Sequence, residues 1–107
     1  MTNSATHPGP NDPADQQARG VGLYRAGAYT EAAELFTALV AAQPDDAAAL
    51  RLLGLCRVRL GDPAAGVTLL ARAVTLAPGD AEALLHYGVG LQAAGRAREA
   101  AEARSSW

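Results

Sequence analysis

The chain has 107 residues, half of them apolar, and a formal net charge of −2 in which every basic residue is an arginine. This length allows one small domain. The slightly negative net charge lacks the excess of positive charge that attracts nucleic acid or an anionic membrane. No stretch approaches the roughly 18 uninterrupted apolar residues of a membrane span, so we expect a cytoplasmic protein with no nucleic-acid or membrane partner.

Residues 1–11 are rich in proline, glycine, asparagine, serine and threonine and show no helical period. Such a segment cannot bury enough apolar surface to order itself, and it predicts a disordered N-terminal tail. A helical domain over residues 12–107 should follow.

Helix signals begin at Asp12, which precedes Pro13, and recur at Asp62, which precedes Pro63. A capping carboxylate followed by proline in the first turn is typical of a helix N-terminus. The chain is also rich in alanine and poor in aromatic residues, which favours an all-α protein. The expected helices cover residues 13–26, 30–42, 46–60, 63–76, 80–94 and 96–106.

Glycine and proline residues recur at matching positions along the chain, at an interval of 34 residues. They are Gly20, Gly54 and Gly88, then Gly27, Gly61 and Gly95, then Pro44 and Pro78. A fixed period of this length indicates one supersecondary unit copied along the chain. We therefore expect three antiparallel helix pairs, in units 13–46, 47–80 and 81–107, each with its glycine turn between the two helices.

Small residues should mark the places where the two helices of a pair cross. Gly54 and Gly88 fall on first helices, whereas Ala32, Gly66 and Ala100 fall on second helices. Glycine inside a helix costs about 1 kcal/mol relative to alanine, so close packing is the expected reason for it. The lone Cys56 stands in a column with Gly22 and Gly90, and we interpret it as a small packing residue.

The pattern resembles the tetratricopeptide repeat, whose 34-residue unit contains a Leu-Gly step, a Gly-Asp turn, an alanine and a closing proline. Leu53-Gly54, Gly61-Asp62 and the stretch from Ala73 to Pro78 carry the resemblance most clearly. The resemblance covers about residues 13–107. It implies a right-handed α-solenoid of stacked antiparallel helix pairs.

Polar residues replace core residues at both ends of this array. Gln16 and Arg19 stand where later units have leucine or tyrosine, and Arg104 stands where Phe36 and Leu70 occur earlier. Either the units are the water-facing ends of a short array, or the chain is a fragment of a longer protein. A homo-oligomer through the C-terminal helix pair, with Trp107 as a contact, or a continuation of the chain is expected to cover the last pair.

The family resemblance also implies that the first helices line a concave groove that holds a protein partner, usually a peptide or a helix. Val21, Leu55 and Val89 are expected to form an apolar ladder along its floor, and the arginines around it favour a partner with negative charge, such as an amphipathic helix. The alternative is that the ladder packs against a neighbouring helix or the chain's own tail. The expected groove residues are Gln17, Val21, Tyr24, Arg25, Arg51, Leu55, Arg59, Glu82, Leu85, His86, Val89 and Gln92.

Glu82 and His86 lie four residues apart on one helical face. A carboxylate and an imidazole at this spacing could act as a general acid–base pair. No phosphate loop, activated nucleophile or ligand cluster accompanies them, so we expect neither an enzyme nor a cofactor or metal. The favoured hypothesis is an adaptor, scaffold or chaperone-like interaction module. The alternative is a non-catalytic N-terminal repeat domain or fragment of a larger enzyme, such as a transferase.

Overall fold

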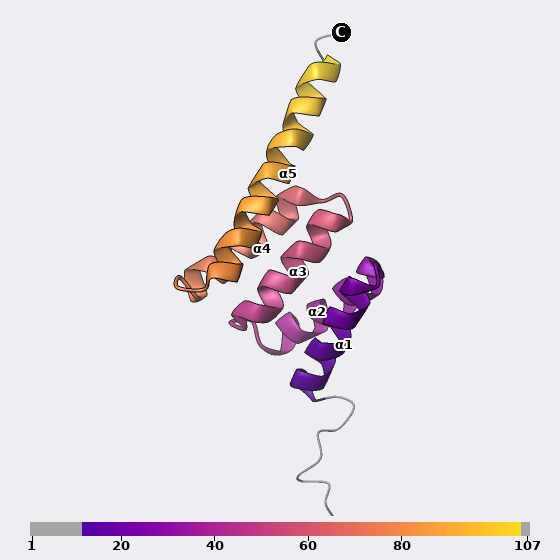
Figure 1. Ribbon diagram of the computed structural model, residues 1–107, viewed down its shortest axis with the longest axis vertical. Coiled ribbons are helices and arrows are strands. Elements are labelled where there is room, and N and C mark those ends of the chain that lie inside the picture. Colours follow the sequence, from indigo (N-terminus) through magenta and orange to yellow (C-terminus); the bar gives the residue numbers. More distant parts are fainter. Residues whose placement is uncertain (1–11, 106–107) are drawn as a thin grey trace, which may run out of the picture.

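The computed structural model describes residues 12–105, with their side chains as far as Arg98, as a row of helices packed side by side (Figure 1). The five helices are α1 (Pro13–Arg25), α2 (Tyr29–Ala42), α3 (Ala47–Arg59), α4 (Pro63–Leu76) and α5 (Ala81–Ser105). Helices α1 and α2 form one hairpin, α3 and α4 form a second, and α5 packs against both α4 and α3. The all-α fold is confirmed. The predicted tail and Trp107 lie outside the described residues.

Aspartate side chains cap four of these helices. Asp12, Asp46, Asp62 and Asp80 each use Oδ1 to accept hydrogen bonds from backbone N–H groups in the first turn, at 2.9 to 3.4 Å. Each bond satisfies a donor that the helix itself leaves unpaired, typically contributing about 1 kcal/mol. The predicted starts at Asp12 and Asp62 are confirmed.

The turns inside the two hairpins depend on glycine. Gly27 has φ of 84° and Gly61 has φ of 87°, a left-handed conformation that costs other residues energy. The three residues after each of these helix ends donate backbone hydrogen bonds back into the helix, such as Asp62 N–H to the Arg57 carbonyl at 2.9 Å. This is the usual glycine-dependent way to end a helix and reverse the chain.

The third expected turn, at Gly95, is absent: α5 continues through it, so the separate helices predicted over 80–94 and 96–106 are wrong. Gly95 is followed by Arg96, whereas Gly61 is followed by the capping Asp62. Register also places Arg104 where Phe36 and Leu70, both fully buried, anchor the earlier second helices. Without a cap or an apolar anchor, reversal loses helical hydrogen bonds and gains little packing, so the alanine-rich helix continues.

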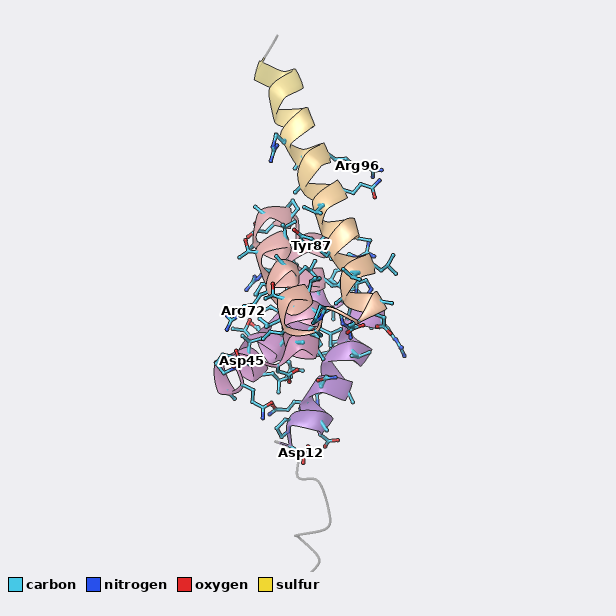
Figure 2. The ribbon with its side chains drawn as sticks, turned by 90° about the vertical axis from the view of Figure 1, so that its left-hand side faces the viewer. Asp12, Asp45, Arg72, Tyr87 and Arg96 are labelled. Carbon is cyan, nitrogen blue, oxygen red and sulfur yellow. The ribbon has the colours of Figure 1, made fainter. Side chains whose placement is uncertain are left out.

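The core lies between the hairpins. A buried apolar cluster from α2 and α3 includes Phe36, Leu39, Leu53 and Cys56. Leu50 and Leu70 are also fully buried, between α3 and its neighbours. The exterior carries charged contacts such as the ion pair between Arg72 and Asp45, whose atoms Nη2 and Oδ1 are 3.5 Å apart (Figure 2).

Glycines bring α3 and α4 together, as the sequence predicted. A Cβ atom at Gly54 would lie 2.8 Å from Leu70 Cγ and 3.1 Å from the Gly66 carbonyl oxygen. The same role predicted for Gly88 is wrong, because nothing lies within 4 Å of a Cβ placed there. Since α5 does not turn at Gly95, the described residues provide no second helix to cross it.

Substituting alanine at these two glycines should therefore have opposite effects. Gly54→Ala should lower the free energy of unfolding by about 1–3 kcal/mol, because the backbone of α4 must move away. Gly88→Ala should raise it by about 0.5–1 kcal/mol, since alanine is the better helix former and meets open space. Urea denaturation followed by circular dichroism measures both, and equal destabilisation by the two variants would contradict the packing described.

Cys56 is fully buried, and burial raises the pKa of its thiol to about 11, against a small opposing effect of the Arg57 charge. Because the thiolate is the reactive form, the folded protein should react with a thiol reagent only through unfolding. Labelling should be slow in buffer and fast in denaturant, and Gly54→Ala should accelerate the slow reaction. Rapid labelling of the native wild-type chain would contradict the burial of Cys56.

Candidate partner-binding site

A hollow of about 350 Å³ opens on the side of the molecule where α1, α3 and α5 meet. Its lining residues are Val21, Tyr24, Arg25, Arg51, Leu52, Leu55, Glu82 and His86. Seven of these were predicted for the groove. Leu52 was missed, although its place three residues before Leu55 is a spacing that shares a helical face.

The floor of the hollow is apolar. Leu52 and Leu55 from α3 are each only 6% exposed, and Val21 from α1 is half-buried beside them. Val89 does not line the hollow and is 38% exposed. The apolar floor in this hollow therefore comes from α1 and α3, and α5 contributes a polar wall.

Arg51 connects α3 to that polar wall. Its Nη1 lies 3.3 Å from Glu82 Oε2 and 3.3 Å from His86 Nδ1, so one guanidinium nitrogen joins both side chains. A guanidinium only donates, so His86 Nδ1 accepts and the imidazole proton is assigned to Nε2. The sequence indicated that Glu82 and His86 share a face, but not that Arg51 bridges them.

The bridge leaves a buried donor of Arg51 without a partner. Its side chain is only 15% exposed, and its Nε is buried with no hydrogen-bond partner in the protein. An unpaired buried donor typically costs 1–3 kcal/mol. An acceptor from a bound molecule would relieve that cost if Arg51, which lines the hollow, shifted to expose Nε.

The environment of His86 favours its neutral form. Burial lowers the pKa of the imidazole, the Arg51 charge lowers it further, and the Glu82 and Asp80 charges partly oppose these effects. A neutral imidazole is also the form that can accept the bond from Arg51. The His86 contact is thus maintained near neutral pH and weakened by acid.

Tyr24 lines the hollow, and Arg59 adjoins the hollow through its contact with Tyr24. Arg59 Nε donates to Tyr24 Oη at 3.0 Å, and its guanidinium carbon lies 6.0 Å from the centre of the Tyr24 ring. The Tyr29 ring meets Tyr24 edge-on, with centroids 5.2 Å apart. These contacts fix the Tyr24 ring between α1, α2 and the end of α3.

The remaining predicted groove residues lie outside the lining of this hollow. They are Gln17, Arg59, Leu85, Val89 and Gln92. Leu85 is 63% exposed, and Gln92 is exposed as well. Gln17 is half-buried on α1.

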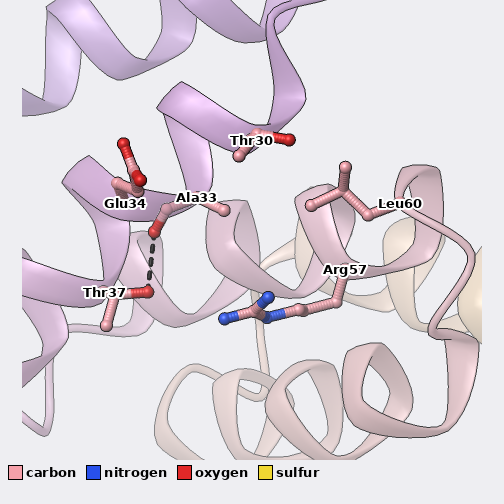
Figure 3. A pocket seen from close by; sticks show the side chains of 6 residues that line it. All are labelled: Thr30, Ala33, Glu34, Thr37, Arg57 and Leu60. Carbon is pink, nitrogen blue, oxygen red and sulfur yellow. Dashed lines mark hydrogen bonds between the residues drawn. The ribbon is translucent and has the colours of Figure 1, made fainter.

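A second hollow, of about 430 Å³, lies between α2 and α3 and is lined by Thr30, Ala33, Glu34, Thr37, Arg57 and Leu60 (Figure 3). The Thr37 hydroxyl already donates to the Ala33 carbonyl at 2.7 Å. Glu34 and Arg57 are the charged residues here, and they come from facing helices (Figure 3). Within residues 12–105, no group of three or more His, Cys, Asp and Glu side chains could hold a metal ion.

Residues 18–81, more than half of the chain, match the tetratricopeptide repeat family, and the chain belongs to it. The fold agrees, since successive helix hairpins stacked in chain order are a helical solenoid. Repeats of this family generally mediate protein–protein interaction and are typically non-catalytic. No curated protein matches this chain. None of the helices described is both long and apolar enough to cross a membrane.

Acid should weaken the folded state through His86. Its pKa in the folded chain lies below the ordinary value of 6.5, so the unfolded chain takes up the proton first as the pH falls. The contribution of neutral His86 is fully present above about pH 6.5 and is lost as the pH falls from there through the lowered pKa. His86→Gln retains an acceptor but cannot titrate, so its stability should fall less over this range.

Urea midpoints measured for wild type and His86→Gln between neutral pH and about pH 5 test this. His7 is present in both proteins, so its titration cancels in the comparison. Identical pH profiles for the two proteins would show that folding does not lower the pKa of His86.

Proposed function

We propose that this chain is a protein-interaction module of the adaptor or scaffold type that holds a peptide or helical segment in the hollow between α1, α3 and α5. The hollow combines an apolar floor, formed by Leu52, Leu55 and Val21, with a basic rim. Such a combination suits a segment with apolar anchors on one face.

The observation that carries the proposal is the unused donor on Arg51. Arg51 lines the hollow, and its Nε is buried without a partner, while Nη1 already contacts Glu82 and His86. A carboxylate or carbonyl oxygen from a bound segment supplies the missing acceptor once the Arg51 side chain shifts to bring Nε to the surface of the hollow. Because Arg51 is held in place by α5, little additional ordering of its side chain is needed on binding.

The charges around the hollow favour an acidic partner. Arg25 and Arg51 line it and Arg59 adjoins it through Tyr24, whereas Glu82 is the one carboxylate among the lining residues. The hollow's volume of about 350 Å³ is at the lower end of the range for ligand pockets. It therefore fits a few apolar side chains of an amphipathic helix, with the rest of the partner lying outside.

Charge reversal at the rim tests this assignment. Arg25 is exposed at the mouth of the hollow, so Arg25→Glu should weaken binding of acidic amphipathic peptides about tenfold without unfolding the chain. Fluorescence anisotropy against a library of amphipathic helical peptides, in acidic versions and versions with lysine in place of the acids, measures the change.

Arg19→Glu is the matched control, because Arg19 is exposed on the same helix but does not line the hollow. It makes the same change in net charge and should leave affinity within about twofold of wild type. An equal loss of affinity in both variants would show that only the overall charge matters, and it would contradict the assignment of the hollow as the binding site. Arg51→Met should reduce the preference for acidic peptides, with the part due to Arg25 and Arg59 remaining.

A further inference from the structure

One face of α5 is apolar and uncovered. Leu84 is 49% exposed and Leu91 is 47% exposed, whereas Leu50, which precedes Leu84 by one repeat, is fully buried. The difference arises because α4 covers this face of α3, and no helix within residues 12–105 covers it on α5.

Glycines alternate with the leucines on this face. Leu84, Gly88, Leu91 and Gly95 follow one another at spacings of four, three and four residues, which keeps them on one side of a helix. We call these four residues the Leu/Gly stripe. Nothing lies within 4 Å of a Cβ atom placed at Gly88 or at Gly95. The stripe therefore consists of two projecting side chains and two open depressions.

The stripe is separate from the other two surfaces of α5. Ala83 and Gly90 are buried, and Gly90 faces Leu70 of α4. Glu82 and His86 face the hollow and Arg51. A molecule that covers the stripe leaves the hollow open.

The stripe complements itself when two copies of α5 run antiparallel. If Leu91 lies opposite Gly88 of the partner subunit, then Leu84 lies opposite the partner's Gly95, and symmetry repeats both contacts. Every leucine then faces a glycine, which lets the helices approach closely, as knobs enter holes. A parallel arrangement instead places leucine against leucine and glycine against glycine.

The charges at the two ends of α5 favour the same arrangement. Asp80 lies just before the first residue of α5, and the exposed Arg98 follows Leu91 by seven residues. The C-terminal part of α5 extends past the other helices (Figures 1 and 2). In the antiparallel register, Arg98 comes beside the partner's Asp80, and both positions share the stripe's side of the helix because Asp80 precedes Leu84 by four residues and Arg98 follows Leu91 by seven. A parallel pair brings like charges together, which is unfavourable.

We propose that a second copy of this chain covers the Leu/Gly stripe, forming a two-fold symmetric dimer through antiparallel α5 helices. Each copy inserts Leu84 and Leu91 into the partner's glycine positions, and Arg98 of each copy pairs with the partner's Asp80. In each subunit the hollow between α1, α3 and α5 remains accessible, so the dimer presents two copies of this binding site.

Sedimentation velocity on the full chain over a range of concentrations should show a reversible dimer. Leu91→Glu should weaken association at least tenfold, because it puts a charge into the apolar contact. Leu60→Glu is the matched control: Leu60 is 41% exposed at the end of α3, away from the stripe, and its variant should dimerise like wild type.

Gly88→Leu separates this proposal from simple destabilisation. The new side chain meets open space within one chain, and leucine is a better helix former than glycine, so the monomer should become more stable. The same side chain fills the depression that the partner's Leu91 needs, so dimerisation should fall at least tenfold. Unchanged dimerisation of Gly88→Leu would overturn the proposed register.

Cross-linking tests the antiparallel orientation. A mixture of Leu84→Cys and Gly95→Cys chains should form a disulfide-linked heterodimer, whereas each variant alone should not, because like positions lie about 16 Å apart along the helix axis. Buried Cys56 does not compete. Cross-linking of each variant alone would indicate parallel helices, and a wild-type chain that stays monomeric at every concentration would overturn the dimer.

Discussion

The structure depends on one contact made in each hairpin: a large side chain on the second helix packs over a glycine on the first. A Cβ at Gly20 would lie 2.5 Å from the Phe36 ring, and one at Gly54 would lie 2.8 Å from Leu70 Cγ. Phe36 and Leu70 are both fully buried. This contact combines the burial of a large apolar side chain with close helix approach, and it offsets the cost of reversing the chain at Gly27 and Gly61.

The hollow follows from the repetition of that contact. Because both hairpins close in the same way, α1 and α3 present equivalent faces, and Val21 and Leu55 meet on one side of the molecule. Helix α5 joins them through a polar connection, in which Arg51 contacts both Glu82 and His86. The hollow is thus apolar where packing repeats and polar where the last helix is attached.

Much of this arrangement could be predicted from the sequence, because the determinants are local and periodic. The capping aspartates, the turn glycines and the 34-residue spacing each specify a feature within a few residues, and most of the hollow's lining followed from that register. The continuation of α5 could not be predicted from the glycine pattern alone. Gly95 occupies the turn position, but whether the chain reverses there also depends on packing by the helix that follows. At the repeat position where Phe36 and Leu70 supply a large apolar side chain, the sequence has Arg104.

Long-range side-chain contacts were also beyond the repeat pattern. Arg51 and His86 are 35 residues apart, and their hydrogen bond depends on how α5 rotates against α3. Periodicity assigns a residue to a face but does not fix which polar atoms meet there. For this reason Val21 and Leu55 on the floor of the hollow could be predicted from the repeat, whereas the contacts of Arg51 with Glu82 and His86 could not.

The straight course of α5 gives this helix three different surfaces. Ala83 and Gly90 complete the packing against α4, Glu82 and His86 form one wall of the hollow, and the Leu/Gly stripe remains uncovered. In the preceding repeat, the equivalent surface of α3 is buried inside the hairpin, since Leu50 is fully buried and Gly54 packs against α4. Loss of a single turn therefore converts an internal packing surface into an external one. Because that surface retains the leucine and glycine spacing that suits helix packing, its chemistry favours another helix as the occupant over a flat or polar surface.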